Sequence, residues 1–234
     1  MTPSHLYEKR YLMPRVTDEY LENKRKEIID AAYRVCLKKP ITSMEMKDVI
    51  DELGFSHGVI YRYYNDLDEV LHDLVLRMNS ENDMEERLKQ ILNSGEPWEK
   101  VIHEMCGMLA ENMLSEGIER LKISAYADML AMSEPDRVLR IASKLNSKIP
   151  SPLTSLEALL SAYLSKTIKA EKLRPIRSKD EIMQFIIVSY HGIQTGYILS
   201  ECYPLPGIDQ RYQPKLMFSC LAESVIHMLK GKRK

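Results

Sequence analysis

Residues 57–63 bring together an imidazole, a guanidinium and two phenols within seven positions, beside a glycine and a valine. Imidazole and guanidinium groups can hydrogen-bond to base edges, valine methyl groups can contact thymine, and phenolic hydroxyls can donate to phosphate oxygens. A glycine lets the backbone approach a duplex closely. The candidates for base contact are His57, Gly58 and Val59, those for phosphate contact are Tyr61 and Tyr63, and Arg62 could reach a phosphate or a guanine.

Two short helices are expected to position these side chains. Residues 46–53 and 57–64 have apolar residues at helical spacing, and Gly54 between them can adopt the left-handed conformation that ends the first helix. Ser56 can accept the free N–H groups at the start of the second helix. The residues predicted to face inward are Val49, Leu53, Phe55, Ile60 and Tyr64. Two brief helices joined by a glycine-containing turn are typical of a helix-turn-helix, whose second helix enters the DNA major groove.

Positive charge near this motif is local rather than global. The chain has a formal net charge of -1, and its first 63 residues contain 11 Lys and Arg against 10 Asp and Glu. The basic residues placed to meet phosphates are Lys24, Arg25, Lys26, Lys38, Lys39 and Lys47. Such runs also occur on ordinary solvated faces, so that interpretation stays open. Upstream, Lys9, Arg10 and Arg15 could form an arm that follows the duplex or belong to a disordered segment.

The order from Gly54 to Tyr64, followed by Asp68-Glu69-Val70-Leu71, resembles the DNA-binding head of the tetracycline-repressor (TetR) family of bacterial regulators. The resemblance covers roughly residues 24–71 and rests on the turn glycine, the Ser-x-Gly pair and the Tyr-x-Tyr-aromatic spacing. It implies that the matching positions contact DNA. It also implies an N-terminal three-helix DNA-binding domain, followed by a larger and divergent helical domain for ligand binding and dimerisation.

Three positions depart from the pattern of the resembled family. Leu67 stands where a lysine is common, which removes one expected phosphate contact, and Ile50 replaces a small residue. The threonine that usually starts the first motif helix is displaced, so Thr42 or Ser43 is predicted to cap that helix one turn early. The candidate DNA contacts are completed by Lys24, Thr42, Ser43, Lys47 and Ser56.

The remaining apolar spacing is helical rather than alternating, which predicts an all-α architecture. A first helix is expected from Lys24 to about Leu37, and Asp66 is expected to cap a fourth helix, which about six more follow. The predicted organisation is an N-terminal extension over 1–19, a helix-turn-helix domain over 20–65, and an effector-binding and dimerisation domain over 66–234. Met13 is a candidate natural start, which would place residues 1–12 outside the native protein.

Two long apolar segments close the chain, from Lys179 to about Cys202 and from Tyr212 to Leu229. The proline-glycine loop between them suits an antiparallel helix pair. Such a pair could join its mate across a two-fold axis or complete the core of one protomer. Recognition of palindromic DNA favours a homodimer, with the two reading helices about 34–36 Å apart or somewhat more.

Methionines are frequent, 14 in 234 residues, and several concentrate in the middle of the chain. Because methionine is flexible and polarizable, a cavity lined by it could repack around a small, largely apolar effector. The same residues could instead be ordinary core, and His191 could be a satisfied interior histidine. The candidate effector-binding residues are Met105, Met108, Tyr126, Met129, Tyr163, Tyr190, His191 and Gln194.

Other functional classes find little support. The chain contains no glycine-rich phosphate loop, no G-x-S-x-G, no H-E-x-x-H and no dinucleotide fingerprint, so neither enzymatic activity nor a cofactor is predicted. His103 and Cys106 could share a metal, but two ligands are too few. The four separated cysteines fit reduced thiols, and no apolar run approaches the ~20 residues of a membrane span. A soluble, cytoplasmic protein without a membrane partner is therefore expected.

Together these features predict a dimeric, ligand-responsive transcriptional repressor that binds a palindromic operator in double-stranded DNA and is released by its effector. The alternative is a helical ligand-binding or protein-interaction module whose head has lost operator recognition, which Leu67 and the weak local charge favour. The two hypotheses differ in whether the outward side chains of residues 57–63 bind a duplex.

Overall fold

The computed structural model describes residues 17–54, 57–80, 83–144, 152–202 and 212–231, and every regular element in these ranges is helical. In chain order the elements are α1 (Asp18–Cys36), the 3-10 helix η1 (Ile41–Ser43), α2 (Met46–Leu53), α3 (His57–Ile60), α4 (Leu67–Ser80), α5 (Met84–Leu92), α6 (Trp98–Glu116), α7 (Ile118–Ser133), α8 (Pro135–Lys144), α9 (Pro152–Ala170), α10 (Lys179–Cys202) and α11 (Pro214–Lys230). Across these residues, none of the helices has the length and apolar character needed to span a bilayer. The predictions about Lys9, Arg10, Met13, Arg15, Phe55 and Ser56 fall outside the described residues.

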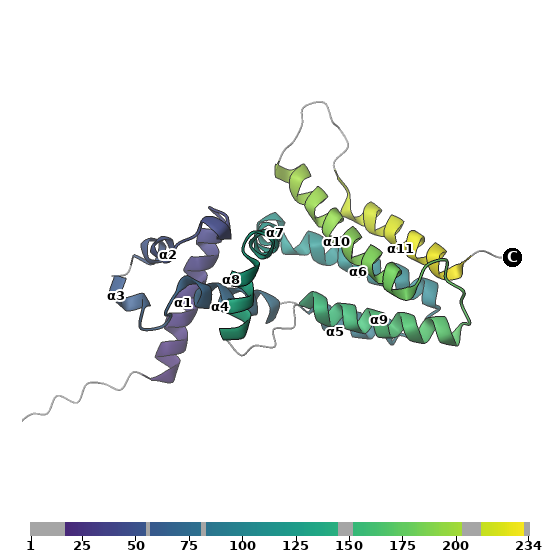
Figure 1. Cartoon of the computed structure of the whole chain (residues 1–234), viewed down its shortest axis with the longest axis horizontal. Coiled ribbons are helices and arrows are strands. Elements are labelled where there is room, and N and C mark those ends of the chain that lie inside the picture. Colours follow the sequence, from purple (N-terminus) through teal and green to yellow (C-terminus); the bar gives the residue numbers. More distant parts are fainter. Residues whose placement is uncertain (1–16, 55–56, 81–82, 145–151, 203–211, 232–234) are drawn as a thin grey trace, which may run out of the picture.

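Two hydrophobic clusters organise the molecule, one toward each end of its long axis (Figure 1). The first joins α1, η1, α2, α3 and the N-terminal half of α4, and we call α1 to α3 the head. The second joins α5, α6, α9, α10 and α11, and we call α5 to α11 the body. Helix α7 contributes to both, because Leu121 lies in the body cluster while Ile123 and Leu130 are buried in the head cluster. The predicted all-α fold, with a helix-turn-helix domain before a larger helical domain, is confirmed.

Helix α1 begins earlier than the sequence pattern indicated. Its N-cap is Thr17, whose Oγ1 accepts a hydrogen bond from the Tyr20 N–H at 3.3 Å, and two acidic residues occupy its first turn. The predicted start at Lys24 was therefore wrong, and residues 24–26 lie inside the helix rather than at its opening. The first turns contain no buried residue, so the apolar periodicity that marks the rest of the helix is absent there.

The N-terminus of α2 is also capped by residues other than those predicted. Thr42 and Ser43 belong to η1, and the Asp48 carboxylate accepts a hydrogen bond from the Glu45 N–H at 2.7 Å. The prediction that Thr42 or Ser43 caps this helix was wrong, because both residues lie within the 3-10 turn and the extended residues Met44 and Glu45 separate that turn from α2.

Gly54 sets the turn between α2 and α3. Its backbone is left-handed, with φ 67°, and its N–H donates to the Ile50 carbonyl at 3.0 Å, as the sequence predicted. After α3, the Tyr64 N–H donates to the Ile60 carbonyl at 3.1 Å, so the chain remains tightly wound beyond the helix. The predicted inward side chains pack in the head cluster, where Val49, Ile60 and Tyr64 are buried and Leu53 is half-buried.

Helices α10 and α11 form an antiparallel pair along one side of the body (Figure 1). Their bounds agree with the two long apolar segments of the sequence. The segment before α10 is tied to the end of α11, because the Ile176 N–H donates to the Met228 carbonyl at 2.9 Å. Within the described residues, α4 is followed by one more helix than predicted, since the break between α4 and α5 carries neither glycine nor proline.

Alanine at each glycine of the motif tests the geometry of the turn. Gly54→Ala forces a Cβ onto a left-handed residue and should lower the free energy of unfolding by about 1 kcal/mol. Gly58→Ala is the matched control, because Gly58 lies in α3 with equally open surroundings. It should leave the stability unchanged or raise it by up to about 1 kcal/mol. Urea unfolding measures both, and equal stabilities would contradict the assigned turn.

Candidate nucleic-acid interface and ligand cavity

Residues 57–63, called the α3 segment, have an inner and an outer side. Ile60 is completely buried, whereas Tyr61 is 53% exposed and Arg62 is exposed as well. Of the other predicted contacts, Gly58 is exposed, Val59 and Tyr63 are half-buried, and the side chains of Ser56 and His57 fall outside the description. The outer side therefore presents a guanidinium, a phenol and open backbone.

A buried tyrosine fastens the α3 segment to α4. The Tyr64 hydroxyl donates to Asp73 Oδ2 at 2.9 Å, and the Arg25 guanidinium lies 5.3 Å from the centre of the Tyr64 ring. Burial, assisted by the Asp73 carboxylate, raises the pKa of Tyr64 well above its usual range, so the phenol keeps the proton that it donates. Contacts from α1 and α4 thus fix the segment in place.

Helix α4 is anchored in the head. Asp66 caps it as predicted, because its Oδ1 accepts a hydrogen bond from the Glu69 N–H at 3.0 Å. Leu67 is only 8% exposed and packs in the head cluster, so the position where the resembled family commonly has a lysine serves packing here. Further along, Arg77 forms an ion pair with Asp30 of α1 at 2.5 Å. The N-terminal half of α4 therefore packs against the head.

Several basic residues predicted to meet phosphates already contact carboxylates. The pairs are Lys24–Glu27 at 2.7 Å, Lys38–Glu52 at 2.5 Å and Lys39–Asp48 at 2.8 Å, and Arg34, which was not among the predicted contacts, also pairs with Glu52 at 2.8 Å. The last three connect the end of α1 to α2, and a lysine hydrogen bond is the main cause that lowers the pKa of Glu52 and of Asp48. In the described part of the chain, exposed Lys47 and Arg62 have no ion-pair partner. Thr42 is half-buried and Ser43 exposed on η1.

Helix α7 contacts both halves of the molecule (Figure 1). Two of its side chains are buried in the head cluster, and η1 packs directly against it. Toward the body, Asp128 of α7 lies 3.7 Å from His191 of α10, measured between Oδ2 and Nδ1. The next helix, α8, adds a further link, because Arg137 contacts Asp68 of α4 at 2.6 and 2.8 Å.

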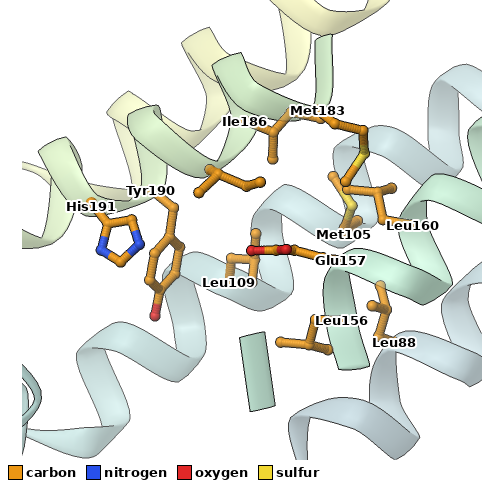
Figure 2. Close-up of a pocket in the computed structure, with 11 residues that line it drawn as sticks. Leu88, Met105, Leu109, Leu156, Glu157, Leu160, Met183, Ile186, Tyr190 and His191 are labelled. Carbon is orange, nitrogen blue, oxygen red and sulfur yellow. The ribbon is translucent and has the colours of Figure 1, made fainter. Parts of the chain in front are cut away.

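A cavity of about 60 Å³ lies among α5, α6, α9 and α10 (Figure 2). Its apolar lining consists of Leu88, Met105, Leu109, Leu156, Leu160, Met183, Ile186 and Ile187. Glu157, Tyr190 and His191 supply the polar groups. Burial raises the pKa of Tyr190 to about 12, so its hydroxyl stays protonated at neutral pH. An apolar wall with few polar groups suits a small molecule, although this volume holds only a few water-sized groups until side chains move.

The structure brings three of the eight predicted effector contacts together at this cavity, namely Met105, Tyr190 and His191. Elsewhere, Met108 and Gln194 are buried away from the lining, Tyr126 packs against the head cluster, Tyr163 packs against the body cluster and Met129 is half-exposed. Sequence reasoning missed the lining from α5 and α9, including Leu88 and Glu157. Helical spacing marked these segments as helices, but it carries no information on which helix faces converge.

The cysteines are separate, as their spacing predicted, and all four are unpaired. Burial raises the pKa of both Cys36 and Cys106 to about 12, so these thiols are poor nucleophiles at neutral pH. Across the described residues, no three His, Cys, Asp or Glu side chains are grouped to hold a metal ion.

Comparison with known proteins places the head in a family. A model of bacterial regulatory proteins of the tetR family matches residues 28–74, which run from α1 into α4. The uncharacterized HTH-type transcriptional regulator YfiR of Bacillus subtilis (strain 168) is 32% identical over 85 residues, which are 36% of this chain and 39% of that protein. The match thus spans well under half of that relative.

The fold as a whole is similar to solved structures. Salmonella enterica GusR matches with a TM-score of 0.60 at 14% identity, covering 92% of this chain and 99% of that one. The fatty acid degradation regulator FadR from Bacillus halodurans matches with a TM-score of 0.62 at 15% identity, covering 89% and 97%. These likenesses show the fold, a helix-turn-helix head on a larger helical domain. The head and the start of α4, residues 28–74, are thus similar to the tetR family of bacterial regulatory proteins.

The ion pairs between α1 and α2 predict a dependence of stability on pH. Because the folded pKa of Asp48 lies below its unfolded value, its pairing stabilises the protein at neutral pH and is lost as the pH falls through the folded pKa. Asp48→Asn should therefore lower the urea midpoint at pH 7, and its deficit should shrink as the pH falls below the unfolded value of about 4.

Asp51→Asn is the matched control, since Asp51 is an exposed carboxylate of α2 with no ion-pair partner among the described residues. It should change the midpoint little at either pH. A deficit of Asp48→Asn that is the same at pH 7 and in acid would contradict the stabilising role of the pair.

Proposed function

We propose that the protein is a dimeric, cytoplasmic transcriptional repressor that binds a palindromic operator and is released by a small, largely apolar effector. The observation that carries the proposal is the α3 segment, which exposes Tyr61 and Arg62 while Tyr64 holds its inner side to α4. A short helix held this firmly can enter a major groove with little ordering cost. In this proposal residues 20–65 read DNA, and residues 66–234 bind the effector and the second subunit.

The proposed dimer uses α10 and α11. Exposed residues recur on α10 at intervals of three and four, at Phe185, Val188, Gly192, Thr195 and Leu199. This is the spacing at which helices pack side by side, and the small residues within it permit close approach. Val188 is 71% exposed, and Leu216 of α11 is also exposed. Apolar side chains gathered on one helix face are typical of a surface that a partner covers.

Release is proposed to pass through α7. His191 lines the cavity and contacts Asp128 of α7, which in turn packs against η1 and the head cluster. A ligand that moves α10 would therefore disturb α7 and the orientation of the head. The effector must bind the DNA-incompetent arrangement more tightly, and ~2.7 kcal/mol of difference gives about a hundredfold loss of operator affinity.

The alternative is a helical ligand-binding or protein-interaction module whose head no longer recognises DNA. The ion pairs of Lys38 and Lys39 favour it, because they leave fewer free cations for phosphates. The weak net charge of the head acts in the same direction.

Binding to the promoter of its own gene distinguishes the two. Arg62→Ala should weaken binding at least about tenfold, and Lys47→Ala should reduce the slope of log K against log salt by about one. Lys166→Ala is the control, because it removes one exposed lysine from α9 in the body. Fluorescence anisotropy at several salt concentrations measures these effects. Binding that both head variants leave intact would favour the alternative.

The dimer has its own test in sedimentation velocity. Val188→Arg places a charge at the centre of the exposed α10 face and should shift the protein to monomer, with at least about a tenfold loss of operator affinity because two half-sites are no longer bound together. Leu139→Arg is the control, since Leu139 of α8 is exposed to a similar extent, 67%, away from that face. A Val188→Arg protein that remains dimeric would place the interface elsewhere.

A further inference from the structure

We propose that the cavity in the body takes an amphipathic cation, that is, an apolar chain or ring ending in an ammonium or another basic group. The inference rests on the proposed function for the role of the cavity and names the chemical class of its ligand. It is carried by Glu157, whose carboxylate projects from α9 toward the middle of the lining side chains in Figure 2.

In the described part of the molecule, Glu157 is a carboxylate without a partner in a largely apolar lining. Among the described residues it has neither a hydrogen-bond donor nor an ion-pair partner, and most of the lining around it consists of leucine, isoleucine and methionine. A ligand that fills this space removes water from the carboxylate, which is costly unless the ligand supplies a compensating charge or donor. A basic group attached to an apolar body supplies that charge where the water is lost.

Other lining residues suit the same ligand. The ring of Tyr190 lies beside the cavity and can face a cation through its π surface (Figure 2). Met105 and Met183 have flexible, polarizable side chains, so they can rearrange to enlarge the space around an apolar chain.

An anionic ligand fits this lining poorly. No lysine or arginine contributes to the cavity as far as the described residues extend. His191 is the lining group able to carry a positive charge, and its Nδ1 already faces Asp128 at 3.7 Å. A ligand carboxylate would approach Glu157, and like charges repel strongly where water is excluded.

A series of ligands that differ in the head group tests the proposal on the full-length protein. Isothermal titration calorimetry at neutral pH would compare octyltrimethylammonium, 1-octanol and octanoate, whose apolar chains are the same. We expect the ammonium compound to bind wild type at least tenfold tighter than octanol, and octanoate to bind more weakly than octanol. Glu157→Gln, which keeps the size of the side chain, should bring the ammonium compound and octanol within about threefold of each other.

Glu171→Gln is the matched control, because Glu171 is an exposed carboxylate just beyond the end of α9. It should keep the wild-type preference for the ammonium compound. Octanoate binding wild type as tightly as the ammonium compound, no binding of any of the three, or an undiminished preference in Glu157→Gln would each overturn the inference. The comparison of the three ligands on the wild-type protein tests the proposal even if Glu157→Gln fails to fold.

Operator release is measured separately, by adding the ammonium compound to the complex with the promoter. Binding that depends on Glu157 without release would uphold the ligand class and count against effector control in the proposed function. If the protein binds its operator but prefers octanoate as a ligand, the proposed regulatory function would stand and the proposed cationic ligand would be rejected.

Discussion

A helix of four residues cannot hold its shape alone in water, so α3 depends on the side chains that bury it. Ile60 is completely buried in the head cluster, and the Tyr64 hydroxyl is bonded to Asp73 of α4. These two attachments leave Tyr61 and Arg62 on the outer side, where the proposed DNA contacts lie. Because these buried contacts hold the motif in place, its rigidity is set by packing against α1 and α4 rather than by α3 itself.

The three helices of the head do not complete its hydrophobic core by themselves. Leu67 and Leu74 of α4, and Ile123 and Leu130 of α7, complete its core. The proposed DNA-reading unit, residues 20–65, therefore shares its packing with helices that belong to the rest of the chain. Since packed cores respond to a shifted helix by changing to another discrete arrangement, a displacement of α7 is communicated to the head as altered packing.

Features governed by local chemistry could be predicted from the sequence, and features governed by distant contacts could not. The turn at Gly54 and the cap at Asp66 follow from neighbouring residues, and both agree with the structure. The free or paired state of Lys38 depends on Glu52, 14 residues away on another helix. The cavity likewise depends on how α5, α6, α9 and α10 converge, which placed Met105 and Tyr190 at its wall and left Met129 exposed. The early start of α1 was not predicted, because its first turns lack apolar periodicity and only the capping Thr17 marks them.

The small volume of the cavity gives the proposed control of DNA binding a mechanical basis. A space of about 60 Å³ holds only part of a ligand of ordinary size, so full entry requires displacement of its walls. Dense interiors compress little, so overfilling shifts helices as well as side chains. His191 links α10 to α7 through Asp128, and α6 also packs against α7, whereas α5 and α9 lie on the other side of the cavity. A ligand accommodated by movement of α9 alone would bind to the cavity without releasing DNA from the head. Affinity for the cavity and control of the head are therefore separable properties of this fold.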